Sequence, residues 1–414
     1  MITFKYKIFA PRPPAVAIDT LGDWQGQDFL LLEYTEDLQE ALAQPYKIAA
    51  VPVGYNTPEH FSFSSALSEI DFSKFDLVIL SEIEHLPLDQ IIEHTLTAIN
   101  NPNYLLAVGC FEFDLPDNII YRPWWIFRHM DLNGETKRQI NNDSKEFLFE
   151  ALLGQKRPHR SFVMAKFQQN PDLLSRSIVT YRNVFGQDSS AGPHVMLLPE
   201  AMSEMLGGNE LLWPYVSPNL NSDWEVENPY GNGINNQISE ITPWKIYDKT
   251  WYSIVCETLW HNPAPNVHNP GIDSPGPFFI SEKIAKVMLG HRLFVMFGQM
   301  HILKFLREQG FKTFDSIIDE SYDNCDNIVE RFTKAFEQIE YLATCDPVDV
   351  MQKTEAIRRH NWQHLYEYRT IRKNQMASLI FNRIPDQHLY DSPSKLPELK
   401  EDQLIRTQWG GVDK

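Results

Sequence analysis

The fold is indicated most clearly by residues 278–298, FFISEKIAKVMLGHRLFVMFG. A polar triplet, Ser281-Glu282-Lys283, separates two apolar runs, and from about Glu282 the apolar residues recur at the spacing of an amphipathic helix. The second apolar run, Leu293–Phe297, is short and continuous, which is typical of a strand buried on both faces. A helix that leads directly into such a strand indicates an α/β fold with a parallel sheet.

The same alternation of short apolar runs and helix-like segments extends over both halves of the chain. The strand candidates are Ile2–Phe9, Phe29–Tyr34, Ile48–Val53, Phe75–Leu80, Tyr104–Cys110, Phe147–Leu153, Ser177–Tyr181, Val195–Leu198, Tyr252–Glu257 and Leu293–Phe297. The helix candidates include Leu88–Ile99, Ser161–Leu174, His301–Gln309, Asp326–Ala343 and Pro347–Phe381. Gly310 follows one of them in the position of a helix-ending glycine.

A chain of 414 residues is too long for one hydrophobic core, and the polar stretch 131–145 separates its two halves. We therefore predict an α/β protein with two Rossmann-like lobes that face a cleft, followed by a C-terminal helical extension. The expected boundaries are 1–140 for the first lobe, 141–345 for the second lobe, and 346–414 for the C-terminal helix and tail.

The charge of the chain limits its partners. The formal net charge is -18 and the pI is about 5.2, so the protein repels polyanions at long range. This disfavours a broad nucleic-acid or anionic-membrane surface. A small anion can still bind in a local basic pocket, because short-range contacts outlast a screened global field.

The N-terminus and the cysteines indicate a cytoplasmic protein. The opening MITFKYKIFAPRPP lacks the apolar core and the cleavage site of a signal peptide. No apolar run reaches the ~18–20 residues that a membrane-spanning helix needs. The four cysteines, at positions 110, 256, 325 and 345, are scattered and include no CxxC pair. They are typical of reduced thiols rather than of a zinc site or a disulfide framework.

Several common catalytic motifs are absent from the sequence. It contains no GxGxxG turn after its first predicted strand, no P-loop and no GxSxG elbow. The histidines show no HExxH or comparable spacing, so we expect no catalytic metal. These absences disfavour a P-loop NTPase and a hydrolase of the GxSxG type.

The triplet Ser281-Glu282-Lys283 is the first candidate binding site. It opens a predicted helix, where backbone N–H groups and the helix dipole favour a bound anion. Lys283 opposes the dipole in the first turn, which makes sense if a phosphate lies between the lysine and the helix end. Glu282 could accept hydrogen bonds from ribose or sugar hydroxyls. The alternative is an ordinary helix start, with Ser281 as the N-cap, Glu282 as a first-turn acid and Lys283 solvated.

The segment KRPHR, residues 156–160, is the second candidate. Arg157 and Arg160 lie after a buried strand and before a predicted helix, where α/β folds place ligands. Guanidinium groups suit diphosphate oxygens because they donate two parallel charge-assisted bonds. A solvated basic turn is the alternative. We also include Glu257, at the carboxyl end of the strand Tyr252–Glu257, among the donor-binding candidates.

Carboxylates that follow two first-lobe strands are candidates for a general base. Glu84 follows Phe75–Leu80, and Glu112 follows Tyr104–Cys110. Both positions are at strand carboxyl ends, so either carboxylate could reach a cleft and deprotonate an acceptor hydroxyl. The alternative is that each is an ordinary loop acid.

A family resemblance adds to these patterns. Residues 278–298, the following LKFLREQGFKTF and DESYD, and the upstream EFLFEALLGQKRPHR resemble the donor-binding lobe of fucosyltransferase-like (glycosyltransferase family 10-like) enzymes, in a bacterial and viral branch. In that group a [ST]EK element opens a helix, and a strand ending in glycine follows. The resemblance covers about Phe147–Arg331.

The resemblance implies a GT-B fold, in which the second lobe holds a nucleotide-diphosphate sugar and the first lobe holds the acceptor. It implies that no bound metal or other cofactor is required. Glu282 would contact the ribose or sugar, Lys283 and an arginine would hold the phosphates, and Glu112 is the nearest match to the base. The serine-proline that follows this base in the fucosyltransferases is absent here.

The sequence therefore predicts a metal-independent glycosyltransferase that transfers a sugar, with inversion, to a glycan or small-molecule hydroxyl. Two alternatives stay open. One is a glycosyltransferase that modifies a DNA base, and the other is a non-catalytic nucleotide- or carbohydrate-binding protein. The sequence does not specify the nucleotide, the sugar, the acceptor, the stereochemistry of transfer, which first-lobe carboxylate is the base, or the oligomeric state.

Overall fold

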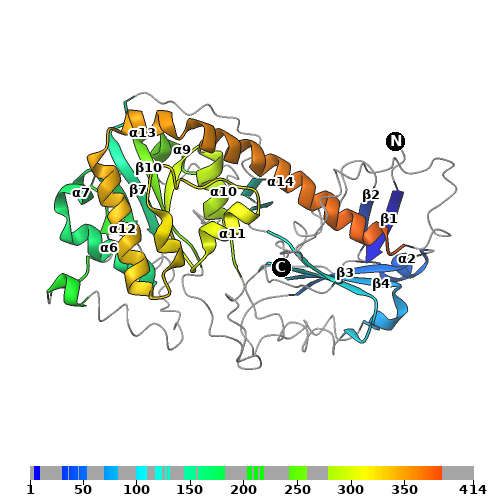
Figure 1. Ribbon diagram of the computed structural model, residues 1–414. Coiled ribbons are helices and arrows are strands. Elements are labelled where there is room, and N and C mark those ends of the chain that lie inside the picture. The colour runs from blue at the N-terminus through cyan, green and yellow to red at the C-terminus, as the bar shows by residue number, and fades with distance from the viewer. Residues whose placement is uncertain are drawn as a thin grey trace, which may run out of the picture. The chain divides into compact units, whose positions relative to one another are not determined.

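The computed structural model describes most of the second half of the chain and parts of the first. The described residues are 4–9, 30–35, 37–44, 46–53, 70–82, 99–109, 117–123, 126–127, 129–130, 144–154, 157–181, 203–207, 209–212, 215–218, 242–258 and 278–384. Tertiary contacts divide the chain into two compact units (Figure 1). Unit 1 comprises Met1–Phe127 and Tyr368–Lys414, and unit 2 comprises Arg128–Glu367.

Unit 1 is built on a six-stranded parallel sheet with the order β2-β1-β3-β4-β5-β6. The strands are β1 (Phe4–Phe9), β2 (Leu30–Thr35), β3 (Ile48–Val53), β4 (Leu77–Glu82), β5 (Tyr104–Val108) and β6 (Ile119–Tyr121). The short helix α2 (Leu38–Leu42) and the 3-10 turn η2 (Phe72–Lys74) lie between strands. Each is capped by an aspartate at its start, Asp37 and Asp71 respectively.

Both faces of this sheet are buried, which explains why its central strands are continuously apolar. One face packs Ala49, Val51, Val78 and Leu80 against α2 and η2. The opposite face carries Ile48, Ala50, Leu77 and Ile79, and it is covered by residues from the far end of the chain. These are Met376, Ala377 and Ile380 of helix α14 (Glu355–Phe381), together with Ile384.

Unit 2 has a five-stranded sheet with the order β11-β10-β7-β8-β9, parallel except for the β8–β9 pair. The strands are β7 (Phe147–Gly154), β8 (Ser177–Tyr181), β9 (Tyr215–Val216), β10 (Thr250–Cys256) and β11 (Leu293–Phe297). The helices are α6 (Pro158–Gln169), α7 (Pro171–Ser175), α9 (Trp244–Lys249), α10 (Glu282–Leu289), α11 (Ile302–Glu308), η6 (Glu320–Asn324), α12 (Ile328–Thr344), α13 (Pro347–Lys353) and the first part of α14.

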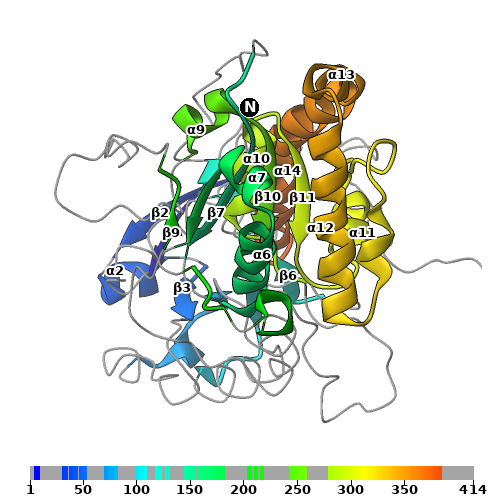
Figure 2. The same ribbon diagram turned by 90° about the vertical axis from the view of Figure 1, so that its left-hand side faces the viewer.

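Helices cover both faces of the unit 2 sheet. Figure 1 shows β7 and β10 between α6 and α12 on one side and α9 and α10 on the other. The helices α6 and α12 lie side by side (Figure 2), and their contact is aromatic, with ring centroids of Phe162 and Phe332 at 6.0 Å and of Phe167 and Phe336 at 5.5 Å. Such aromatic pairs bury large apolar areas and fix α6 against the rest of the unit.

The α/β class and the parallel sheets are confirmed, and several elements differ from the predicted bounds. The helix predicted from Ser161 begins at Pro158, because proline is favoured in the first helical position, and it ends at Gln169 before a second proline. The predicted helix Pro347–Phe381 is two helices, α13 and α14, that meet at Thr354. Val195–Leu198 and nearly all of Leu88–Ile99 lie outside the described residues. Within the described part of the chain, no helix combines the length and the apolarity needed to cross a bilayer.

Candidate functional site

The direction of the strand order reverses between β7 and β10. From β7 the chain passes through α6 to β8 on one side, and from β10 it passes through α10 to β11 on the other. Parallel α/β sheets bind ligands at such a reversal, outside the carboxyl ends of the strands. Helix α6 follows β7, and helix α10 follows β10. The N-termini of both helices are therefore expected at the two neighbouring strand ends where a ligand binds.

The start of α10 is fixed by Glu257, the residue that follows β10. Ser281 is the N-cap, and its Oγ accepts a hydrogen bond from the Lys283 amide at 3.3 Å. The Glu257 carboxylate accepts from the Ser281 amide and from Ser281 Oγ, both at 2.6 Å, and from the Thr258 amide at 2.7 Å. We call this group of residues, Glu257, Thr258 and Ser281–Lys283, the α10 corner. Glu257 has no exposed surface, so it holds the α10 corner from the interior of the unit.

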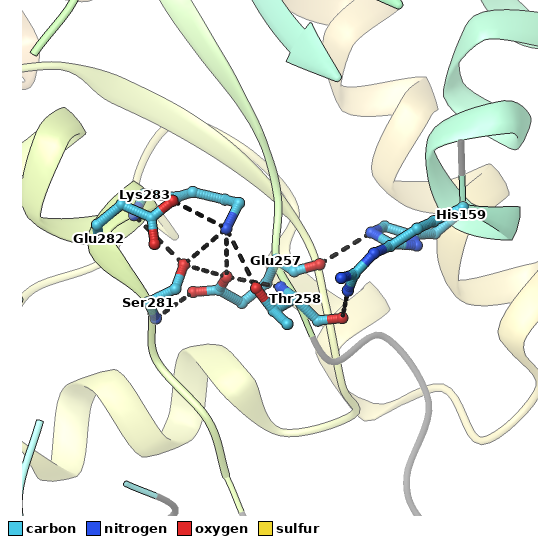
Figure 3. A network of polar contacts seen from close by, with 7 residues as sticks. His159, Glu257, Thr258, Ser281, Glu282 and Lys283 are labelled. Carbon is cyan, nitrogen blue, oxygen red and sulfur yellow. Dashed lines mark hydrogen bonds and ion pairs between the residues drawn. The ribbon is translucent and has the colours of Figure 1, made fainter. Parts of the chain in front are cut away.

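Lys283 lies over this anchored corner. Its Nζ donates to Ser281 Oγ at 2.9 Å, to Thr258 Oγ1 at 3.2 Å and to Glu282 Oε1 at 3.2 Å, and it lies 3.7 Å from Glu257 Oε2 (Figure 3). The Lys283 side chain remains 24% exposed. The lysine is therefore neither a freely solvated first-turn residue nor a fully buried one.

Glu282 is held as a carboxylate. Burial alone would raise its pKa, but Lys283 and Lys286 outweigh that effect and lower the pKa to about 2. The side chain is 9% exposed and so is almost entirely buried. An ionised carboxylate only accepts hydrogen bonds, so Glu282 suits a ligand that presents hydroxyl donors.

The start of α6 approaches Glu257 from the other side. His159 Nε2 lies 2.9 Å from the main-chain oxygen of Glu257, and Arg157 Nη1 donates to the oxygen of Thr258, also at 2.9 Å. Because a carbonyl oxygen only accepts, His159 must carry its proton on Nε2. Burial, together with Arg160 and Arg157, lowers the pKa of His159 well below its usual range. The imidazole is therefore a neutral donor that ties α6 to the end of β10.

Arg160 lies in the first turn of α6 and is 7% exposed. Burial lowers its pKa to about 10, which still leaves the guanidinium charged at neutral pH. Gly154, the last residue of β7, has a φ of +62°, a conformation that favours glycine. A Cβ atom at Gly154 would lie 3.5 Å from Arg160 Nη1. The negative charges of Glu282 and Glu257 act on Arg160 and oppose the effect of burial on its pKa.

The neighbouring Cys256 is not a candidate nucleophile. Burial raises the pKa of this thiol to about 12, although Arg160 and Lys283 act in the opposite direction. The thiol therefore stays protonated at physiological pH, and the reactive thiolate is not formed.

The third helix at these strand ends, α11, is already capped from within. Asp323 Oδ1 and Oδ2 accept hydrogen bonds from the amides of Leu303 and Lys304 at 3.1 and 3.0 Å. Glu320 likewise accepts from the Phe314 amide at 2.7 Å. The DESYD segment therefore has a structural role, because its carboxylates hold α11 and the GFKTF loop in place.

The structure brings six of the predicted site residues to one place: Arg157, Arg160, Glu257, Ser281, Glu282 and Lys283. Arg160 is inside helix α6 rather than before it, which corrects its expected position. The predicted bases Glu84 and Glu112 lie outside the described residues. His159 and Thr258 were not singled out from the sequence. The only signal for them was their place directly beside predicted site residues.

The described residues contain no group of three or more His, Cys, Asp or Glu side chains arranged to hold a metal ion. Comparison with known proteins adds no name to this site, because no protein-family model and no curated protein matches the chain.

Proposed function

We propose that unit 2 binds a nucleotide-diphosphate sugar and that the protein is a metal-independent glycosyltransferase. The observation that carries this proposal is the meeting of two helix N-termini, those of α6 and α10, at neighbouring strand ends. Helix N-termini attract phosphate through their unpaired amides and their dipoles. Two of them at neighbouring strand ends suit a ligand with two phosphates.

The charges of the corner favour an anion. Arg157, Arg160 and Lys283 supply three positive charges, and Glu257 and Glu282 supply two negative charges. The local balance is positive in a chain whose net charge is -18. A leaving diphosphate gains negative charge during transfer, and positioned cations that stabilise such charge lower the barrier.

Glu282 and Lys283 differ in what they offer to a ligand. The ionised Glu282 accepts hydrogen bonds and so suits the hydroxyl groups of a ribose or of the transferred sugar. Lys283, a cation whose side chain is 24% exposed, suits the phosphate oxygens. This division agrees with the roles that the fucosyltransferase-like resemblance implies for the two residues.

In the proposed reaction the acceptor hydroxyl attacks the anomeric carbon of the donor sugar. A carboxylate of the first unit, Glu112 or Glu84, takes the hydroxyl proton, and the nucleoside diphosphate leaves with the bonding electrons. Attack from the face opposite the leaving group inverts the anomeric centre. The two-lobed GT-B arrangement is part of the proposal and is supported by the two parallel sheets.

Thermal-shift screening against UDP, GDP, CDP and their sugars tests donor binding. A ligand present at about 100 times its dissociation constant stabilises the folded state by about 2.7 kcal/mol, which gives a visible shift of the melting temperature. We expect one nucleoside diphosphate to shift the melting temperature more than its monophosphate does. Equal shifts for both, or none, would count against a diphosphate site.

A turnover assay then separates the remaining functions. Release of nucleoside diphosphate in the presence of hydroxyl acceptors supports transfer. Binding without release from any sugar nucleotide favours the non-catalytic alternative. Duplex DNA binding that weakens steeply with salt favours the enzyme that modifies a DNA base.

A further inference from the structure

Glu257 is the most connected residue of the corner, although it has no exposed surface. Oε1 accepts from the Ser281 amide, and Oε2 accepts from Ser281 Oγ and the Thr258 amide. Its main chain is equally engaged, since its amide donates to the Phe297 oxygen at 2.9 Å and its oxygen accepts from His159. Such a residue acts on a ligand only through its neighbours.

The hydrogen-bond directions form a chain from Glu257 to Lys283. The Glu257 carboxylate only accepts, so the Ser281 hydroxyl proton must point to Oε2. The lone pairs of Ser281 Oγ then face Lys283, whose amide and Nζ donate to it at 3.3 and 2.9 Å. The Glu257 side chain thus sets the orientation of the hydroxyl, and the hydroxyl sets the position of the ammonium group (Figure 3).

We infer that Glu257 is a positioning residue, which fixes Lys283 and the N-terminus of α10 in the arrangement that receives the diphosphate. The inference rests on the proposed function for the identity of the ligand. It rests on the contacts alone for the placement of Lys283.

The substitution Glu257→Gln tests this directly because the amide cannot replace the carboxylate. If its NH2 group takes the place of Oε1, it faces the Ser281 amide. If it takes the place of Oε2, it faces the Thr258 amide. Either orientation sets donor against donor in a buried site, so the corner must rearrange. Size is preserved, so the effect reports on hydrogen bonding.

Glu320→Gln is the matched control. Glu320 is also buried in unit 2, and its carboxylate accepts from the Phe314 amide at 2.7 Å and from Arg307 at 2.9 Å. These bonds hold the loop at Phe314 rather than the start of α10. Any loss of general stability should therefore occur in both variants, whereas loss of positioning should occur only in Glu257→Gln.

Two readouts are needed. The first is the acetylation rate of Lys283, measured by mass spectrometry with the other lysines as internal references. We expect a severalfold rise in Glu257→Gln and no change in Glu320→Gln. The second is the dissociation constant of whichever of UDP, GDP or CDP binds the wild-type chain. We expect it to rise roughly tenfold or more in Glu257→Gln alone, as for loss of a hydrogen bond to a charged group.

Unchanged Lys283 acetylation in Glu257→Gln overturns the inference, and so does faster acetylation with unchanged nucleotide affinity. If the wild-type chain binds none of the three nucleotides while acetylation still rises, the proposed function fails and the placement of Lys283 by Glu257 stands. Should Glu257→Gln not fold, Ser281→Ala interrupts the same chain at its middle, and the same rise in Lys283 acetylation is expected.

Discussion

His159 Nε2 lies 2.9 Å from the main-chain oxygen of Glu257, a residue 98 positions further along the chain. This bond joins the first turn of α6 to the end of β10 across the reversal of the strand order. Because the same Glu257 holds the N-cap of α10 through its carboxylate, the two helix starts share one frame. The cations of α6 and the lysine of α10 are therefore fixed relative to each other.

Loss of the Lys283 side chain should abolish most of the transfer activity. We expect Lys283→Ala to lower turnover by about 10²–10³, the usual effect of removing one donor that stabilises developing charge. The fold should persist, since Glu257 keeps three other donors and Glu282 keeps Lys286 nearby. Steady-state kinetics beside Lys353→Ala, which removes an exposed lysine of α13, provide the comparison. Turnover within a few-fold of the wild type in Lys283→Ala would contradict the assignment.

Buried neutral histidines should make the protein less stable in mild acid. Burial and the nearby Lys286 lower the pKa of His129 to about 3, whereas an unfolded histidine titrates at about 6.5. Below about pH 6.5 the unfolded chain binds a proton that the folded chain does not, so stability falls as the pH falls. His129 should contribute about 2 kcal/mol to the loss between pH 7 and pH 5. Urea unfolding of the wild type and His129→Gln at both pH values measures it, and equal pH dependence of the two would refute this origin.

Gly310 should be intolerant of a side chain. Its φ is +89°, and an added Cβ would lie 2.7 Å from His364 Nε2, which lies 2.8 Å from the Gln309 oxygen. Gly207 also has a positive φ, +56°, but its Cβ would meet nothing within 4 Å. Both alanine variants incur the left-handed backbone penalty of about 1–2 kcal/mol. Gly310→Ala should cost about 1 kcal/mol more, because His364 must move and lose its bond. Equal denaturation midpoints for the two variants would show that the His364 contact is unimportant.

Asp323 should stabilise unit 2 through its cap on α11. Asp323→Ala leaves the amides of Leu303 and Lys304 buried without their acceptor, so we expect a loss of about 1–3 kcal/mol. Asp319→Ala removes an exposed cap, whose carboxylate accepts from the Ser321 amide at 2.9 Å, and should cost less than about 1 kcal/mol. Urea denaturation of both variants gives the comparison. A loss in Asp319→Ala as large as that in Asp323→Ala would argue against the cap.

Much of the fold could be predicted from local pattern. Ile48–Val53, Ser177–Tyr181 and Leu293–Phe297 are strands with the predicted bounds, since strands buried on both faces are continuous apolar runs. The glycine at 310 ends α11 as predicted. The start of α6 at Pro158 was missed, because the basic residues around that proline resemble a turn.

The site could be predicted only in part. The polar triplet at 281–283 stood out because it opens a predicted helix, and the arginines at 157 and 160 stood out as cations beside a strand end. Glu257 was predicted to contact a ligand, but its side chain is completely buried and accepts hydrogen bonds from Ser281 and Thr258 instead. His159 carried no signal of its own, since a lone histidine in a basic segment has no spacing to compare.

The sequence by itself determined several strands with their bounds, the acidic net charge and the residues that open α10, because these depend on neighbours along the chain. Only the tertiary structure decided the strand order, the return of α14 to cover the first sheet, and the meeting of α6 with α10. The reason is physical: a bond such as that between His159 and Glu257 depends on which strands become neighbours, and local periodicity is the same for every possible order.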